Sequence, residues 1–415
     1  GDMLVLASTI DLVKKLCPNR KISIVAPDCE SYAWASRNDG SFRGIGVHPT
    51  PTRIRPFRTV RFGCSKQRRR FPRHLLDNLP SPFWLLTLIC FLSILPILYL
   101  TSEFKKTLRT LSQASLILWC SGNIFFAPKG YGLHSIFEEM FTLYFCKMML
   151  RKTTIFAPIS LGPIQSILTR TLLKNLLNQV DYILLRESIS YEYAKAMGVT
   201  NRNIRVSTDS AFLYERELPQ SGPDSKRTPF VLGVTPLSSA SQRCMEEVAS
   251  FLRNLMENGG VVLLPFSPFE CDITTADQIS NSLGHAKEVV KHDLAYANSE
   301  DLLKRVSEVD ILVAMRLHSV IAASLLGIPS IAIVGQKNKF WGILRQLKME
   351  DYALDLESLT KEGLELKLSL LLKEMDTVKL RLHEIVPRMR EDAGGLGHLV
   401  KALLLRSTPA ERPRH

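Results

Sequence analysis

Two arginines and a histidine follow short apolar runs of the sequence, where they could bind an anion and move a proton. Arg316 and His318 come directly after the run 310–314, and Arg186 follows another such run. Arginine offers a planar fork for phosphate or carboxylate, and histidine is the side chain suited to proton transfer near neutral pH. The spacing leaves structural roles open as alternatives. Arg316 could stabilise the fold, His318 could cap a helix, and Arg186 could form an ion pair with Glu187.

Further polar residues follow other apolar runs. Gly122 and Asn123 belong to a tight turn after the run 115–120, and His134 comes soon afterwards. Lys339 follows the run 330–334. No paired carboxylates, no DxD motif and no Cys or His pair with ligand spacing stand beside them, so the pattern predicts no metal site. The polar residues that follow the apolar runs are therefore arginines, lysines, histidines and a glycine turn. Such a set is suited to bind a small, highly charged anion.

The elements that must position these side chains are predicted from short runs rich in Val and Ile, which alternate with segments of helical period. Continuous apolar strands between helices indicate a parallel sheet covered on both faces, which is a doubly wound α/β fold. The predicted strands are Ile22–Ala26, Ser115–Cys120, Thr153–Ala157, Tyr182–Leu185, Val231–Thr235, Val261–Pro265, Asp310–Ala314 and Ser330–Val334. The predicted helices are Ala7–Leu16, Ile136–Met149, Ile167–Asn178, Ser241–Glu257 and Ser319–Leu326, with further helical periodicity over Thr360–Leu405.

One polar, proline-rich stretch interrupts this alternation and divides the chain. Residues 215–229 are predicted to be a linker between a Rossmann-like domain at 1–214 and a second at 230–405, which includes closing helices. Residues 406–415 are predicted to be disordered. Ligands of open α/β sheets bind at the carboxyl ends of the strands, so we expect two such edges to face each other across a cleft.

The charge of the chain is unevenly distributed. Net charge is +13, and residues 50–76 contain nine Lys or Arg and no Asp or Glu. The uncharged run Phe83–Leu100 follows, so residues 50–100 read as an insertion in the first domain. A core helix, an interfacial helix and a membrane span are all compatible with its length. Basic residues beside an apolar, Trp-bearing run favour contact with an anionic membrane surface over nucleic acid, which would call for more interleaved aromatic residues.

Composition narrows the class of protein. The 46% apolar content excludes general disorder, and 415 residues suggest two or three domains. Eight scattered cysteines without a CxxC motif indicate reduced thiols and a cytoplasmic protein. No secretory signal pattern stands at the start, and because the chain begins with Gly1, further sequence could precede it.

At this point the residues resemble the polysaccharide pyruvyl transferase family. The most specific part is Val309–Lys339, with its R-L-H motif, G-x-P and following lysine; the supporting segments are Ser121–Asn123, Ile159–Pro163, Arg186–Ser190 and Thr208–Phe212. Gly1-Asp2 is similar to the family's N-terminal G-D turn, whose preceding strand is missing here. Asn123 also departs from the pattern, since many members carry further glycines there.

The resemblance implies a GT-B-like fold of two Rossmann-like domains and transfer of the enolpyruvyl group of phosphoenolpyruvate (PEP) to a sugar diol, with no cofactor. It implies that Arg316 and Arg186 bind the donor and that His318 is the general acid. The residues that it implies for substrate binding are Asp2, Gly122, Asn123, His134, Leu317 and Lys339.

Two other functions remain open on the sequence. The first is a GT-B glycosyltransferase that uses a nucleotide sugar, but the predicted helix after His318 has no acidic residue to hold a ribose. The second is a non-catalytic membrane scaffold of glycan assembly, which would not need Arg186, Arg316 and His318 at strand ends. The expected partners are PEP, a free or lipid-linked glycan and an anionic membrane, with no nucleic acid, and the expected place is the inner face of the membrane.

Overall fold

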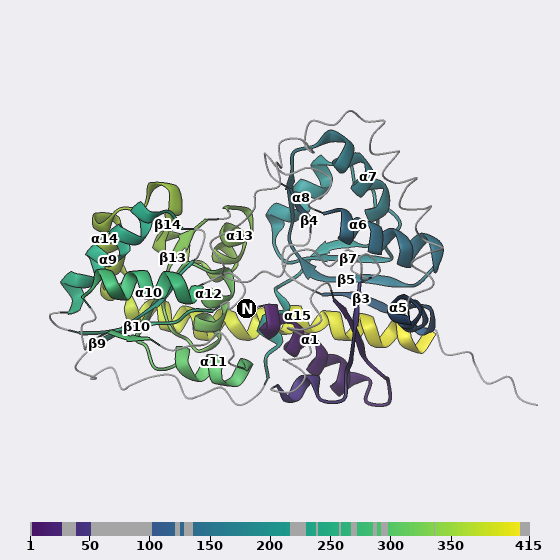
Figure 1. Ribbon diagram of the computed structural model, residues 1–415, viewed down its shortest axis with the longest axis horizontal. Coiled ribbons are helices and arrows are strands. Elements are labelled where there is room, and N and C mark those ends of the chain that lie inside the picture. Colours follow the sequence, from purple (N-terminus) through teal and green to yellow (C-terminus); the bar gives the residue numbers. More distant parts are fainter. Residues whose placement is uncertain are drawn as a thin grey trace, which may run out of the picture. The chain divides into compact units, whose positions relative to one another are not determined.

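The computed structural model describes residues 2–26, 39–50, 102–120, 125–127, 136–215, 230–237, 240–256, 259–266, 272–284, 289–291, 298–335 and 337–406 (Figure 1). These residues form two compact units. Unit 1 comprises residues 1–9 and 208–394, and unit 2 comprises residues 10–207 and 395–415. The predicted insertion at 50–100, nearly all of the predicted linker and the predicted tail lie outside the described residues.

Unit 1 is built on a parallel six-stranded sheet of order β11-β10-β9-β12-β13-β14. Its strands are β9 (Phe230–Thr235), β10 (Gly259–Leu263), β11 (Val289–Lys291), β12 (Ile311–Ala314), β13 (Ser330–Val334) and β14 (Ala353–Asp355). Its helices are α9 (Gln242–Met256), α10 (Asp272–Ser282), α11 (Ser299–Val306), α12 (Leu317–Leu325), α13 (Lys337–Leu347) and α14 (Lys361–Lys373).

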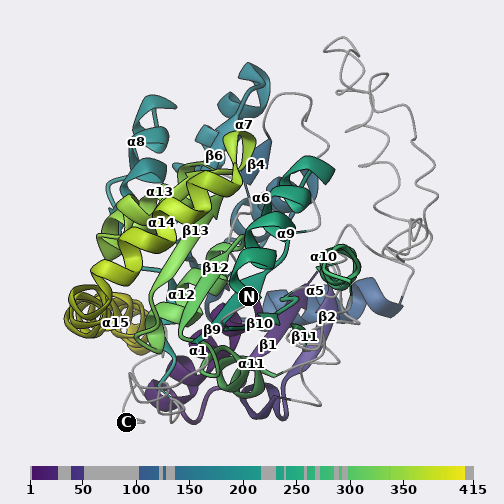
Figure 2. The same cartoon turned by 90° about the vertical axis from the view of Figure 1, so that its left-hand side faces the viewer.

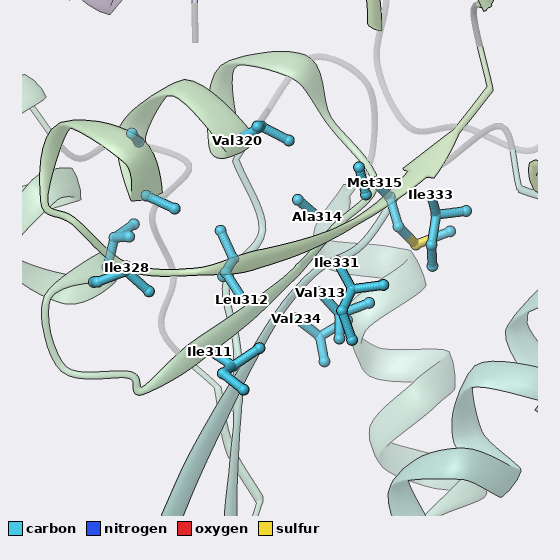
Figure 3. Packing of buried hydrophobic residues seen from close by; sticks show 14 of the residues in the cluster. Val234, Ile311, Leu312, Val313, Ala314, Met315, Val320, Ile328, Ile331 and Ile333 are labelled. Atoms are coloured by element: carbon cyan, nitrogen blue, oxygen red, sulfur yellow. The ribbon is translucent and has the colours of Figure 1, made fainter. Parts of the chain in front are cut away.

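Nearly continuous apolar residues explain why the central strands of unit 1 are buried. Every residue of β12 and of β13 is buried, as expected for strands covered on both faces. Helix α9 packs against α10 and α14, whereas α11 packs against α12. Figure 2 shows the strands side by side between these helices, and Figure 3 shows the strand side chains in the core, among them Val234, Leu312 and Ile331.

Unit 2 contains a parallel four-stranded sheet of order β3-β5-β7-β8 and two parallel strand pairs, β1-β2 and β4-β6. Its strands are β1 (Ser23–Ala26), β2 (Gly46–Pro49), β3 (Ile117–Trp119), β4 (Phe125–Ala127), β5 (Thr154–Ile159), β6 (Leu161–Ile164), β7 (Tyr182–Leu185) and β8 (Ile204–Val206). Its helices are α5 (Ser102–Gln113), α6 (Phe137–Tyr144), which continues as a π-helical turn over Phe145–Met149, α7 (Ile167–Leu177) and α8 (Ser188–Ala196).

Two helices contribute residues to both units. Helix α1 (Asp2–Leu16) adds Leu4 and Val5 to the core of unit 1 and Leu12 to that of unit 2. Helix α15 (Met375–Arg406) follows α14 and likewise passes from unit 1 into unit 2 at residues 394 and 395. None of the helices in the described part of the chain is long and apolar enough to cross a membrane.

The eight predicted strands are all present, within a few residues at each end. The two units differ from the sequence-based division in three places. Residues 1–9 and 208–214 cluster with unit 1, where Ala211, Phe212 and Tyr214 pack into the hydrophobic core, and residues 395–405 cluster with unit 2. The structure also adds short strands that the sequence did not reveal, among them β6 and β14, which are only four and three residues long.

Candidate active site

The R-L-H segment lies at the point where the sheet of unit 1 changes direction. Strands β9 and β12 are neighbours, with Ala314 opposite Thr235, and their connections run to β10 on one side and to β13 on the other. In open α/β sheets this switch point, at the carboxyl ends of the strands, is where ligands bind. Because β12 ends at Ala314, residues 315–319 stand at this position.

A chain of buried hydrogen bonds fixes this turn against β9. The Met315 amide donates to Thr235 Oγ1 at 3.1 Å, and Ser319 Oγ donates to the Arg316 carbonyl at 2.6 Å. The hydroxyls of Thr235 and Ser319 are 2.8 Å apart, and since Ser319 already donates, Thr235 is the donor between them. Thr235 and Ser319 are both fully buried, so the strand end and the first turn of α12 form one rigid unit.

Arg316 is held by a buried carboxylate. It is the N-cap residue of α12 in extended conformation, and its Nε and Nη2 donate to the two carboxylate oxygens of Asp272, the first residue of α10. Asp272 is 0% exposed and the Arg316 side chain 16%. A two-point ion pair of this kind fixes the plane of the guanidinium. A guanidinium has five N–H donors, so one carboxylate does not exhaust its capacity to bind an anion.

His318 stands opposite a second buried carboxylate. Its Nε2 lies 3.8 Å from Asp209 Oδ2, within ion-pair range but beyond a direct hydrogen bond. Asp209 is 1% exposed, and its Oδ1 accepts the Ala211 amide at 2.9 Å, which caps the 3₁₀ turn Ser210–Leu213. The imidazole is 14% exposed. The carboxylate is therefore anchored on one oxygen and presents the other to the histidine.

Sequence reasoning missed two site residues, Asp272 and Asp209. Asp209 lies in a segment of the family motif, but the sequence assigns it no role, because it is more than a hundred residues from His318. The signal that could have found it is an acidic residue beside a short helical turn, Asp-Ser-Ala-Phe, just before the expected linker.

Two further predicted residues lie near the same sheet edge. Leu317 is 4% exposed and packs into the hydrophobic core, so what it can offer a ligand is its backbone N–H at the N-terminus of α12. Lys339 lies in the first turn of α13, which follows β13, the neighbour of β12. The sheet thus brings the R-L-H segment and the start of α13 to one edge.

Arg186 belongs to a separate buried network in unit 2. It follows β7 directly, is 1% exposed, and its Nε lies 2.5 Å from Ser160 Oγ and 3.4 Å from Glu187 Oε2. Glu187 also accepts hydrogen bonds from Ser160 and Ser190. The ion pair with Glu187 that the sequence left as an alternative is present. Contact of Arg186 with a substrate stays a prediction.

The remaining predicted residues fall outside what the structure describes. Gly122, Asn123 and His134 lie in segments that are not described, and Asp2 begins α1 without a described side chain. No group of three His, Cys, Asp or Glu side chains within the described ranges could hold a metal ion.

Comparison with known proteins assigns the chain to one family and identifies solved structures with a similar fold. The family model "polysaccharide pyruvyl transferase" matches residues 1–336. The amylovoran biosynthesis protein AmsJ of Erwinia amylovora is 23% identical over 288 residues, which are 63% of this chain and 67% of AmsJ.

Solved structures resemble the chain over nearly its whole length. HepE of Anabaena, in complex with UDP-glucose, has a TM-score of 0.54 at 11% identity, with 98% of this chain and 96% of HepE covered. UDP-GlcNAc 2-epimerase of Neisseria meningitidis, bound to UDP-GlcNAc, has a TM-score of 0.55 at 10% identity, with 98% and 97% covered. At such low identity these similarities concern the fold alone, which is GT-B-like.

Proposed function

The chain belongs to the polysaccharide pyruvyl transferase family, and we propose that it transfers the enolpyruvyl group of PEP to two hydroxyls of a sugar, which leaves a cyclic pyruvate ketal and releases phosphate. The observation that carries this proposal is the R-L-H segment at the sheet switch point. There an anchored arginine and a carboxylate-facing histidine begin the same helix, α12.

The reaction needs one group that gives a proton to carbon. His318, as the imidazolium, protonates the methylene carbon of PEP, and the positive charge that develops at C2 is shared with the bridging phosphate oxygen. One sugar hydroxyl adds to C2 and loses its proton. The bond from C2 to the phosphate oxygen then breaks, and the second hydroxyl closes the ketal. The diol loses two protons, of which one returns the imidazole to imidazolium and one leaves with phosphate. A well-placed acid contributes about two to four orders of magnitude in rate.

Each buried carboxylate has a distinct role in this proposal. Asp272 orients the Arg316 guanidinium, which binds the donor together with the N-terminal amides of α12. Asp209 orients the imidazole and stabilises its charged form. The ring nitrogen that faces Asp209 is Nε2, so Nδ1 carries the proton that is transferred. Lys339 and Arg186 are assigned to substrate binding on the family pattern.

Calorimetric titration tests donor choice without knowledge of the acceptor. We expect the purified protein to bind PEP and to bind UDP-glucose at least ten-fold more weakly, because an anchored arginine and a helix N-terminus suit a compact anion. Arg316→Lys should weaken PEP binding, since an ammonium group cannot form the same two-point contact. Tight UDP-glucose binding without PEP binding would instead identify a nucleotide-sugar enzyme.

Turnover is tested with a panel of methyl hexopyranosides, which present 4,6-diols and vicinal diols. Sugar-dependent release of phosphate from PEP is the expected result. In D₂O one deuterium should enter the ketal methyl group, because the proton on carbon comes from a side chain in exchange with solvent. Phosphate release without a mass increase of the sugar by the ketal would contradict transfer.

The membrane part of the proposal concerns residues outside the described structure. Nine cations in residues 50–76 precede Phe83–Leu100, and each cation near an anionic leaflet contributes about 1 kcal/mol. We expect a peripheral protein on the cytoplasmic face that acts on a lipid-carried glycan. Replacement of Arg68, Arg69 and Arg70 by Gln should weaken binding to anionic vesicles and leave binding to neutral vesicles little changed.

A further inference from the structure

Helix α7 has one face in the core of unit 2 and a second apolar face directed to solvent. Leu173 and Leu177 are buried in the hydrophobic cluster that also holds residues of α6. On the outer side, Ile167 is 73% exposed, Leu168 43% and Leu172 40%. Leu168 and Leu172 are one turn apart, and Ile167 begins the helix on the other side of the exposed Thr171. We call these three exposed side chains the α7 ridge. Core packing does not explain its apolar character.

The neighbouring helix also exposes apolar side chains. Helices α6 and α7 contact each other and are labelled in Figure 1. At the end of α6 and in the following turn, Tyr144 is 44% exposed, Met148 46% and Met149 52%. Six of the eleven large apolar side chains that are exposed in the described residues therefore come from α6, its π-helical turn and α7. Such a concentration marks an interaction surface rather than scattered surface leucines.

Helix α7 carries charge of a single sign, because it contains two cations and no Asp or Glu. The wider stretch 140–180 also lacks Asp and Glu, although Lys147 within it is paired with Asp181, and Glu138 and Glu139 stand in the first turn of α6. The same stretch contains five cations, which are Lys147, Arg151, Lys152, Arg170 and Lys174. Two of them, Arg170 and Lys174, are part-exposed and stand one turn apart on α7 itself, on the side of Ile167. Exposed apolar side chains and cations on one helix complement a surface that is apolar inside and negatively charged at its rim.

We propose that the α7 ridge, with Arg170 and Lys174, is a membrane-contact surface that inserts its apolar side chains into the headgroup region of a bilayer containing anionic lipid. Helices that lie on membranes combine an apolar face with flanking Lys and Arg in this way. Exposed leucines elsewhere differ in setting: Leu366 on α14 follows Glu365 directly. This surface is distinct from residues 50–100, and it does not depend on which donor or acceptor the protein uses.

Vesicle co-sedimentation of the full chain tests the proposal. Vesicles of phosphatidylcholine alone are compared with vesicles that also contain about one third phosphatidylglycerol. The ridge variant is Ile167→Gln, Leu168→Gln and Leu172→Gln, since Gln favours helices. The charge variant is Arg170→Gln and Lys174→Gln. The matched control is Leu366→Gln and Leu380→Gln, which removes leucines that are 67% and 62% exposed on other helices.

The expected pattern distinguishes apolar insertion from charge attraction. The ridge variant should lose about ten-fold or more in affinity for anionic vesicles and should lose residual binding to neutral ones. The charge variant should lose about ten-fold on anionic vesicles only, and its loss should disappear in high salt. The control should bind like the parent. Sedimentation velocity of each variant at the same concentration reports whether the face instead joins two copies of the chain.

Three results would overturn the proposal. One is parental affinity of the ridge variant for anionic vesicles. Another is that the parent chain binds no vesicles. The same conclusion follows if replacement of Arg68, Arg69 and Arg70 abolishes vesicle binding and the ridge variant still binds like the parent. The third is a parental dimer that the ridge mutations convert to a monomer, which would show that a second copy covers the face.

Discussion

Replacement of Asp209 by Asn is the sharpest test of the proposed proton donor. The amide oxygen of Asn can still accept the Ala211 amide, so the 3₁₀ turn at Ser210–Leu213 keeps its cap. The other oxygen, which faces His318 Nε2, is exchanged for an NH₂ group. An N–H donor there favours an imidazole without a proton on Nε2, so the substitution removes the negative charge and opposes the imidazolium.

The size of the effect follows from the distance and the burial. Two unit charges 3.8 Å apart interact by ~4 kcal/mol at an effective dielectric constant of about 20. That corresponds to about a factor of a thousand in the fraction of His318 that carries the transferable proton, at a pH where an imidazole without the carboxylate is neutral. General acid catalysis itself contributes about 10²–10⁴. We therefore expect kcat on the high-pH side of the profile to fall by about 10²–10³, with a smaller loss at low pH, where His318 is protonated in both proteins, and a smaller change in the KM for PEP.

The assay is sugar-dependent phosphate release from PEP over a range of pH. The high-pH limb of the parent profile, where the imidazolium is lost, should move to lower pH in Asp209→Asn. His318→Gln is the partner variant. If Asp209 acts through His318, the double variant should be no slower than His318→Gln alone, because residues that act as a unit are not additive. Thermal unfolding of Asp209→Asn controls for loss of structure.

Two results would refute this reasoning. An unchanged kcat in Asp209→Asn would remove the carboxylate from the mechanism. A full additional loss in the His318→Gln background would show that Asp209 acts independently of the histidine, for example on the fold around the 3₁₀ turn.

Three further outcomes are expected. Arg316→Lys should raise the KM for PEP several-fold and lower the temperature of half-unfolding. The reason is that one ammonium group cannot satisfy both carboxylate oxygens of the fully buried Asp272. A lower kcat with an unchanged KM would contradict a role of Arg316 in binding. Thr235→Val keeps the shape but removes the hydroxyl that contacts the Met315 amide and Ser319, and it leaves the amide its longer bond to the Thr235 carbonyl at 3.3 Å. It should lower the free energy of unfolding in urea by ~0.5–1.5 kcal/mol, and an unchanged free energy would show that the hydroxyl does not stabilise the turn. Burial, and then Lys106 and Lys21, lower the pKa of His48, so below about pH 6.5 the unfolded chain takes up a proton there more readily than the folded protein. Stability should therefore fall as the pH drops through that range, and His48→Leu should flatten this dependence in thermal melts at pH 7.5 and 5.5.

The parallel sheet was predictable because its strands are buried on both faces. The run 182–185 is apolar throughout and 330–334 is apolar after Ser330, and their limits agree with β7 and β13. The missed strands are short and lack that signal. Strand β8, for example, is three residues long with two of them exposed, and its place is set by pairing with β7 rather than by its own pattern.

The candidate site was predictable only in part. Arg316 and His318 follow from one rule, that ligand-binding residues come after strands. Asp272 and Asp209 cannot be predicted in this way, because only the folded chain brings each of them to its partner. Asp272 is 44 residues from Arg316 in the sequence, and Asp209 lies in a turn that packs on α12. Sequence shows which cations stand at strand ends, but it cannot show which carboxylates hold them.

The hydrogen-bond chain that links Met315, Thr235, Ser319 and Arg316 makes the site inseparable from the sheet of unit 1. Its anchor on β9 is 80 residues away along the chain from Met315. The Met315 amide should therefore exchange with solvent deuterium only when β9 and β12 separate, at the slow rate of global opening rather than the fast rate of a surface loop. Heating should then abolish activity together with the sheet and not before it. A substitution that stabilises the β9–β12 core would extend the working temperature of the enzyme without touching a catalytic group.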